Sequence, residues 1–302
     1  MRVRSGVACS RSTIDAMMPD TTTEPGHSSS GTVGAMTSKR VLITGCSTGI
    51  GRATAVDLHA RGYEVIATAR RSETIEDLDV AGTIALDVDS DESVANVVAE
   101  AGPIDVLVNN AGFGVEGPIE TVPLDEVRRM FETNVFGSAR MIQAFLPGMR
   151  ERGSGAIVNI TSTAAIAAPP LGGYYAATKF AMEAISEALK IEAGHFGIRV
   201  FAIEPGVIET SFGSNALDHR AEPGPYEELG TLWTKAMEIL GGGQVAPGPE
   251  LVATAIATAL ESDGSRLRWP VGQDAELIAA ARTGTDYDDF VSGMRTVLNL
   301  DW

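Results

Sequence analysis

The chain of 302 residues has the composition of an ordinary folded protein, with 44% hydrophobic and 21% charged residues. Its 40 Asp and Glu residues outnumber its 23 Lys and Arg residues, and the formal net charge of −17 argues against binding to nucleic acid or to an anionic membrane surface. No apolar stretch reaches the roughly 18 residues that a membrane helix needs. Cys9 and Cys46 are too few for a disulfide framework or a four-ligand zinc site. These features predict a cytoplasmic protein with no membrane span and no metal site.

The first part of the chain differs in composition from the rest. Residues 1–36 are rich in Ser, Thr, Gly and Pro and show no apolar period, so we expect a disordered N-terminal extension. Its basic start lacks the apolar region of a secretory signal, although an Arg- and Ser-containing transit peptide stays open as an alternative. We expect residues 37–302 to form a single α/β domain.

From residue 40 onward, short β-branched runs alternate with longer stretches of helical spacing, which is typical of a parallel sheet covered on both faces. The predicted strands are Val41–Thr44, Tyr63–Thr68, Thr83–Leu86, Ile104–Asn109, Ala156–Ile160 and Arg199–Ile203. The predicted helices are Ile50–Arg61, Ser90–Ala101, Leu124–Arg150 and Tyr175–Ala193. The alternation predicts a doubly wound, Rossmann-like parallel sheet.

The pattern changes after Thr210. Glycine and proline loosen it, so we expect a mobile lid over about residues 211–250. The C-terminal elements, 250–302, are predicted as helix Glu250–Leu260, a possible strand Leu267–Val271, helix Ala275–Ala281 and the tail Phe290–Leu298.

A glycine-rich turn joins the first predicted strand to the first predicted helix. Missing side chains at Gly45, Gly49 and Gly51 would let backbone amides at a helix N-terminus approach a pyrophosphate. A purely structural turn is the alternative. The candidate binding residues are Gly45, Cys46, Ser47, Thr48, Gly49, Ile50 and Gly51. We expect Cys46 to be a small residue that fills space and donates its backbone amide, and this role is favoured over that of a reactive thiol. The T-G-x-x-x-G-I-G pattern resembles that of the short-chain dehydrogenase/reductase family.

A second motif follows the fourth predicted strand. Asn109-Asn110-Ala111-Gly112 resembles the family's N-N-A-G motif, which implies contacts of Asn109, Ala111 and Gly112 on the adenosine side of a nucleotide cofactor. Asp87 and Val88 follow the third strand, and strand carboxyl ends are where ligands bind in open sheets. For Asp87, a turn or capping role is the alternative.

Tyr175 and Lys179 lie four positions apart in a predicted helix and therefore share one face. A free tyrosine has a pKa near 10, so proton transfer at neutral pH needs a cation that stabilises the phenolate, and Lys179 can supply it. Ser162 follows the fifth strand and could donate a hydrogen bond to a substrate oxygen. The resemblance implies that Asn134, Ser162, Tyr175 and Lys179 form the family's catalytic tetrad, in which the lysine also binds the nicotinamide ribose and the asparagine holds a water of a proton relay.

A proline–glycine segment follows the sixth strand. Pro205, Gly206, Ile208 and Thr210 lie in a run that resembles the family's P-G segment, which implies contacts with the nicotinamide and the phosphates. The cofactor-binding core is therefore expected over residues 40–210.

Arg70 ends the second strand, where an acidic residue would favour NAD. A guanidinium can bind the 2′-phosphate of NADP through two hydrogen bonds, so we expect NADP(H) as the cofactor. Thr48 supplies no second basic residue in the glycine loop.

The expected function is hydride transfer between NADP(H) and a carbonyl or secondary alcohol, with a hydrophobic small-molecule substrate of steroid, retinol or ketone type. The alternatives are an NAD-preferring dehydrogenase and a non-catalytic NADP-binding sensor. The resemblance also implies a homodimer or homotetramer formed through the long helices.

Overall fold

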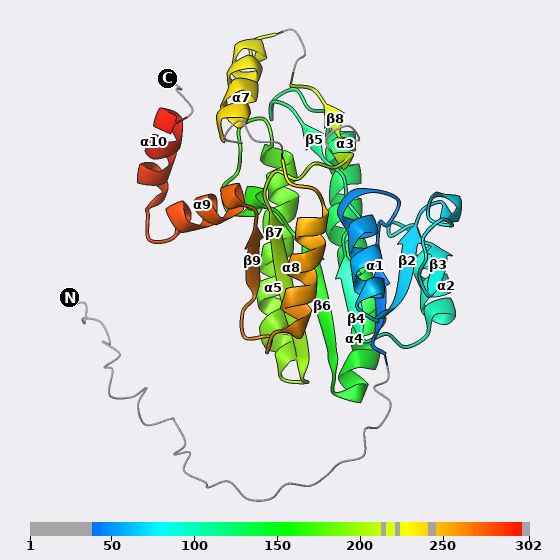
Figure 1. The fold of residues 1–302 in the computed structure, drawn as a ribbon. Coiled ribbons are helices and arrows are strands. Elements are labelled where there is room, and N and C mark those ends of the chain that lie inside the picture. Colours follow the sequence, from blue (N-terminus) through cyan, green and yellow to red (C-terminus); the bar gives the residue numbers. More distant parts are fainter. Residues whose placement is uncertain (1–37, 213–215, 221–223, 241–245, 298–302) are drawn as a thin grey trace, which may run out of the picture. The chain divides into compact units, whose positions relative to one another are not determined.

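The computed structural model describes residues 38–212, 216–220, 224–240 and 246–297. The expected disordered extension, residues 1–36, lies outside the described residues. At the centre is a parallel sheet of seven strands in the order β3-β2-β1-β4-β6-β7-β9, so the chain winds outward in both directions from β1 and β4 (Figure 1). The strands are β1 Arg40–Ile43, β2 Glu64–Ala69, β3 Gly82–Ala85, β4 Val106–Asn109, β6 Gly155–Ile160, β7 Ile198–Pro205 and β9 Arg268–Val271. This is the predicted doubly wound fold.

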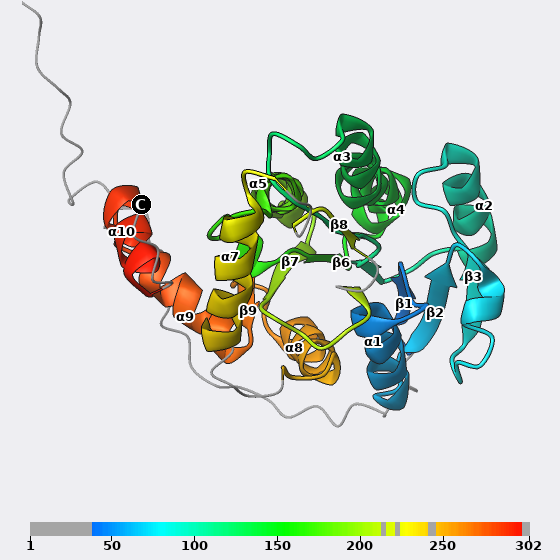
Figure 2. The same ribbon diagram turned by 90° about the horizontal axis from the view of Figure 1, so that it is seen from above.

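Helices cover both faces of the sheet, as the view from above shows (Figure 2). Helices α1 (Gly49–Ala60) and α8 (Glu250–Glu261) pack on one face, and α2 (Asp91–Ala101), α4 (Ser138–Arg152) and α5 (Gly173–Gly194) pack on the other. Neighbouring residues of one strand enter different cores. Val41 and Ile43 of β1 belong to the first core and Leu42 to the second, which explains why the strand sequences are apolar without alternation.

The segment between β7 and β9 is more ordered than predicted. A two-stranded parallel ribbon joins β5 (Val115–Glu116) to β8 (Leu217–Asp218), and α7 (Glu227–Leu240) follows. Together with α3 (Leu124–Phe131), this ribbon lies beyond the carboxyl ends of the sheet strands (Figure 1). The prediction of an irregular lid over 211–250 therefore missed one short strand and one helix, while residues 213–215, 221–223 and 241–245 lie outside the described residues.

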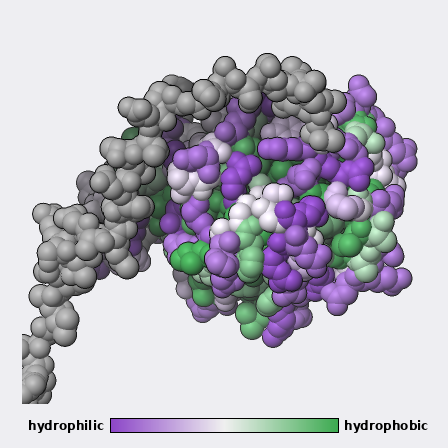
Figure 3. Space-filling model, turned by 90° about the horizontal axis from the view of Figure 1, so that it is seen from below, coloured by the Kyte–Doolittle hydropathy of each residue, from purple (hydrophilic) through white to green (hydrophobic). Residues whose placement is uncertain are grey.

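The last described elements are α9 (Gln273–Arg282) and α10 (Tyr287–Val297), where the sequence predicted a shorter helix, Ala275–Ala281, and a tail, Phe290–Leu298. Within the described residues, none of the helices combines the length and the hydrophobicity needed to cross a membrane. The face seen from below shows mostly hydrophilic residues with small hydrophobic groups between them (Figure 3). The predicted functional residues gather at the opposite end, where the sheet strands terminate.

Candidate active site

The glycine loop between β1 and α1 has a backbone that only small residues allow. Gly45 and Gly49 adopt φ angles of +76° and +58°, in the left-handed region. A Cβ atom at Gly51 would lie 2.4 Å from the carbonyl oxygen of Gly45, closer than real Cβ contacts come. The three glycines therefore fold the loop tightly over the start of α1.

The N-terminus of α1 fits a nucleotide phosphate. Thr48 is the N-cap residue, but its side chain makes no capping hydrogen bond, and the first turn contains no acidic residue. The side chain of Thr210 comes within 3.3 Å of where a Cβ of Gly49 would lie, so the P-G segment meets the glycine loop here. The backbone amides at the start of a helix carry a partial positive charge, and here no carboxylate of the first turn competes for them. An anionic ligand can therefore bind there. Ser47, Ile50 and their neighbours in the loop would hold the phosphates through backbone amides.

Cys46 differs from the rest of the loop because its donor groups are used inside the protein. Its amide donates to the carbonyl of Thr68 at 2.8 Å, and its thiol lies 3.3 Å from the carbonyl of Ile43. Burial raises the pKa of the thiol to about 12. The cysteine thus fills space, and its amide is not available to a phosphate, contrary to the predicted contact.

The N-N-A-G motif supports the glycine loop from β4. The side chain of Asn109 is buried and donates to Asn159 at 2.9 Å, so it faces the interior. Asn110 donates instead to the carbonyls of Thr44 and Gly45, at 2.8 and 3.1 Å, and thereby fixes the loop. The amide of Ala111 donates to the hydroxyl of Thr44 at 2.9 Å. The structural role of Asn110 was not among the predicted contacts.

Residues after β3 and β2 lie where the adenosine side of a cofactor is expected. The half-buried Asp87 accepts a hydrogen bond from the amide of Asp89 at 3.1 Å, and the buried Val88 packs where Gly137 leaves room. Arg70 is exposed at the end of β2, and its guanidinium has no hydrogen bond or ion pair with any residue that the structure describes. Its charge is therefore available to an anion.

Asn134 lies in an irregular part of the long predicted helix Leu124–Arg150. A π-helical turn, Glu132–Gly137, separates α3 from α4. The Asn134 amide donates to the carbonyl of Phe113 at 2.9 Å and to the hydroxyl of Thr178 at 3.1 Å, and its oxygen accepts from the amide of Phe113 at 3.0 Å. The absence of a side chain at Gly112 lets this oxygen approach, because a Cβ there would lie 2.9 Å from it. Such π turns often occur at functional sites.

Tyr175 and Ser162 meet at the carboxyl end of the sheet. The phenol of Tyr175, on α5, makes a side-chain hydrogen bond with Ser162, which follows β6. The Ser162 oxygen also accepts from the amide of Ala164 at 3.1 Å, and this bond fixes its position. Burial raises the pKa of Tyr175 to about 12, the Ser162 hydrogen bond lowers it in part, and the negative charge of Glu116 raises it further.

The side chain of Lys179 lies beside Tyr175, as the spacing predicted. Its Nζ is 5.7 Å from the centroid of the tyrosine ring and donates to the carbonyl of Ile160 at 2.9 Å. Burial lowers the pKa of Lys179 to about 8. The expectation of a lowered tyrosine pKa is wrong for this arrangement, because burial of the phenol is the largest effect on its pKa and raises it. At neutral pH, Tyr175 is protonated.

The P-G segment is held by a residue from outside the predicted motifs. The amide of Gly206 donates to the carbonyl of Val271 at 3.0 Å, and the amide of Val207 donates to Asp274 Oδ2 at 2.7 Å. Ile208 packs against the first core. Asp274 lies in the first turn of α9, about 70 residues away along the chain, so no local sequence signal could have identified it.

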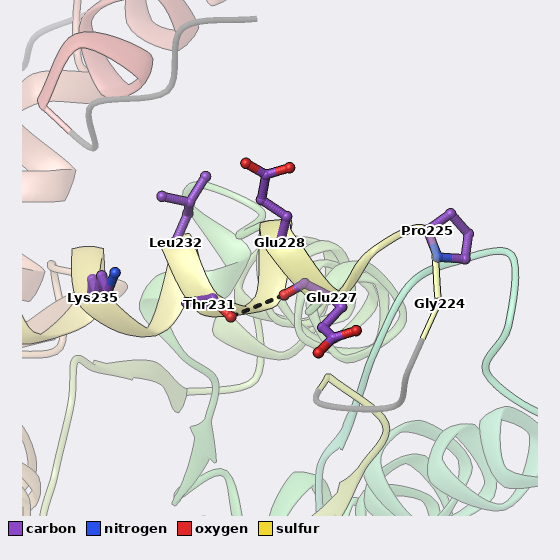
Figure 4. A pocket seen from close by; sticks show the side chains of 7 residues that line it. All are labelled: Gly224, Pro225, Glu227, Glu228, Thr231, Leu232 and Lys235. Carbon is purple, nitrogen blue, oxygen red and sulfur yellow. Dashed lines mark hydrogen bonds between the residues drawn. The ribbon is translucent and has the colours of Figure 1, made fainter.

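A surface pocket of about 560 Å³ lies along the first turns of α7 (Figure 4). It is lined by Gly224, Pro225, Glu227, Glu228, Thr231, Leu232 and Lys235. The hydroxyl of Thr231 donates to the carbonyl of Glu227 at 3.1 Å, a bond within the helix itself. None of the predicted site residues lines this pocket, and it carries no group suited to the chemistry described above.

A doubly wound sheet with a glycine loop at the first strand and a Ser-Tyr-Lys group at its carboxyl edge defines an α/β protein of the nucleotide-binding Rossmann type. A family model described as short chain dehydrogenase matches residues 39–221, more than half of the chain. The chain belongs to this family of oxidoreductases.

Relatives and solved structures agree with this assignment. The chain is 35% identical to the uncharacterized oxidoreductase YbbO of Escherichia coli over 245 residues, covering 79% of this chain and 87% of the relative. It is 42% identical to human retinol dehydrogenase 8 over 192 residues, which cover 59% of this chain and 62% of that protein. A short-chain dehydrogenase from Streptomyces avermitilis has a similar structure, with a TM-score of 0.74, 38% identity, and coverage of 87% of this chain and 96% of that one.

Proposed function

We propose that the protein transfers hydride between NADP(H) and a hydrophobic carbonyl compound or secondary alcohol. The observation that carries the proposal is the meeting of Tyr175, Ser162 and Lys179 at the edge of the sheet where the glycine loop and the P-G segment come together. When bound, the nicotinamide supplies or accepts the hydride. The protein's task is to orient the substrate oxygen and to handle its proton.

The side chains suit these tasks. Tyr175 is protonated at neutral pH, so its hydroxyl can donate a proton to a carbonyl oxygen that gains negative charge. Ser162 lies within hydrogen-bonding distance of the phenol and can donate to the same substrate oxygen. Lys179 carries a positive charge below a pH of about 8 and would hold the ribose. Asn134 connects α5 to the loop that follows β4 and would support the proton relay.

Preference for NADP rests on Arg70. An exposed guanidinium without a partner in the described part of the chain can bind a 2′-phosphate, which NAD lacks. Solved relatives include a Burkholderia cenocepacia dehydrogenase in complex with NADP and a Brucella melitensis reductase complexed with NADH. Because one of these relatives binds NADP and the other NADH, the side chain of Arg70 is the better indicator of the cofactor preference.

A hydrophobic substrate is supported by the residues around the phenol. The ring of Phe212 lies 5.6 Å from that of Tyr175, and the buried Ala164 and Ala165 follow the catalytic serine in the chain. The similarity to retinol dehydrogenase 8 favours a hydrophobic alcohol or carbonyl compound. Acidic or strongly polar substrates would lose hydration here without gaining partners.

The organisation of the chain completes the proposal. Residues 40–210 form the cofactor-binding core, the described residues between 211 and 250 cover the substrate, and a homodimer or homotetramer forms through α4 and α5. Phe180 and Ile191 of α5 are 45% and 80% exposed, which supports burial of this helix in an interface. Sedimentation equilibrium tests whether the protein is a dimer or a tetramer.

The small number of cysteines supports a reducing compartment, the cytoplasm.

Absorbance at the reduced-nicotinamide band tests the function, with a panel of retinoids, steroids and simple ketones and with Tyr175→Phe as the matched control. We expect oxidation of NADPH by at least one ketone or aldehyde in the wild type and loss of that signal in the variant, with nucleotide affinity retained. Equal turnover of NADH would favour the NAD-preferring alternative. Tight NADP binding without turnover across the panel would favour the sensor.

A further inference from the structure

Two buried glutamates lie next to the candidate active site, in the interface between α5 and β7. Glu183 is 6% exposed and lies one helical turn after Lys179. Glu204 is 1% exposed and directly precedes Pro205 in β7, the strand that ends in the P-G segment. Both glutamates are thus attached to elements that carry cofactor-binding residues.

One arginine lies against both carboxylates. Arg268 comes from β9, the edge strand beside β7 (Figure 1), and its Nε is 2.9 Å from Glu183 Oε2 and 3.7 Å from Glu204 Oε1. Its other end contacts Glu187, an exposed residue of α5. The charge of Arg266, whose guanidinium lies over the ring of Trp269, also acts to lower the pKa of Glu204.

This arrangement does not neutralise two carboxylates. Oε1 of Glu183 and Oε1 of Glu204 are both buried and have no hydrogen-bond partner among the described residues. A single shared guanidinium that is itself 45% exposed offsets one negative charge, and a second buried negative charge without a partner is strongly unfavourable. Burial and the charge of Glu183 raise the pKa of Glu204 to about 7. Protonation of one carboxyl group removes the excess charge.

We propose that Glu204 keeps a proton beside Glu183 and that the two glutamates act as positioning residues, keeping the helix that carries Lys179 against the strand that leads into the P-G segment. When this proton leaves, two negative charges face one arginine, and their repulsion separates α5 from the end of β7. Lys179 and the P-G segment then lose their spacing, and the affinity for the nucleotide falls. This last consequence rests on the proposed NADP binding, whereas the proton on Glu204 does not.

Infrared spectroscopy detects the proton directly, in the protein alone. The wild type should show the carbonyl stretch of a buried carboxylic acid at about pH 6 and lose it by about pH 9. Glu204→Gln should lack this band, and Glu187→Gln should keep it because Glu187 is exposed and outside the pair. A wild-type spectrum without a band that Glu204→Gln removes would overturn the assignment of a proton to Glu204.

Nucleotide binding tests the coupling. The dissociation constant of NADPH, measured by fluorescence titration, should match in wild type and Glu204→Gln at about pH 6, and the wild type should bind about tenfold more weakly than this variant at about pH 9. Lys179 titrates in both proteins, so the difference between them reports the carboxyl pair. Glu204→Ala should bind weakly at both pH values, because it lacks the side chain that the neutral glutamine preserves.

Removal of the arginine gives an independent variant that leaves both carboxyl groups in place. Arg268→Gln should move the loss of NADPH affinity to higher pH, because the pair then holds its proton more tightly. Parallel pH curves for wild type and Glu204→Gln would overturn the coupling. If the wild type binds no nucleotide at any pH, the proposed function fails, and the infrared result still decides whether Glu204 holds a proton.

Discussion

Replacement of Lys179 by methionine should stabilise the fold while it abolishes catalysis. The ammonium group is buried, and its pKa falls from an ordinary value of 10.5 to about 8. At about 1.4 kcal/mol for each tenfold change in proton affinity, this difference corresponds to roughly 3.4 kcal/mol of unfavourable burial at neutral pH. Loss of the hydrogen bond to the carbonyl of Ile160 costs about 1 kcal/mol. Lys179→Met should therefore be about 2 kcal/mol more stable at pH 7, with a melting temperature higher by roughly 4–8 °C.

The pH dependence has a defined sign. Because the folded pKa of Lys179 lies below the unfolded value, the unfolded chain binds more protons between about pH 8 and 10.5, and wild-type stability rises with pH through this window. The methionine variant lacks this rise, so the two stabilities converge at alkaline pH. Urea unfolding at several pH values measures the stability of the wild type and of the methionine variant. Lys190→Met is the matched control: this lysine of the same helix also donates to a carbonyl, that of Gly264, but is only partly buried, and its replacement should bring no gain. A Lys179→Met variant less stable than wild type at pH 7 would refute the reasoning.

Three further predictions concern the glycine loop and the adenosine end. Arg70→Asp should invert the preference for NADP over NAD by placing a carboxylate against the 2′-phosphate; unchanged affinities for both nucleotides would show that Arg70 points elsewhere. Gly51→Ala should weaken nucleotide binding at least tenfold and lower the melting temperature, since its Cβ would lie 2.4 Å from a loop carbonyl. A variant with the same binding and melting curves as the wild type would contradict this contact. Cys46 should stay unreactive toward a thiol reagent until the protein unfolds, because the thiol is buried and its pKa is about 12; rapid labelling of folded protein would disprove this.

The sequence predicted the sheet well because its strands are buried on both faces. Such strands give apolar runs that end where the chain leaves the core, so the predicted and observed bounds differ by only one or two residues for most strands, as with Val41–Thr44 against Arg40–Ile43. Ser162, Tyr175 and Lys179 could be brought together in advance, since one follows a central strand and the others share a helix face.

Other features depend on contacts that no local pattern records. The strands β5 and β8 form by pairing with each other although they lie far apart in the sequence, and α7 lies in a glycine- and proline-containing stretch that predicted an irregular lid. The π turn at Asn134 interrupts a continuous helical pattern because its side chain bonds to the backbone of Phe113. Asp274 and Glu204 act across elements far apart in the sequence. The tyrosine pKa was predicted in the wrong direction because the extent of burial is not visible in spacing alone.

A crystal structure of the protein with NADP bound tests the central claim most directly. The account predicts the pyrophosphate on the amides of the glycine loop, the 2′-phosphate at Arg70, and the hydroxyl of Tyr175 facing the nicotinamide ring with Ser162 beside it. A nucleotide bound elsewhere, or a phenol turned away from the nicotinamide, would contradict the account.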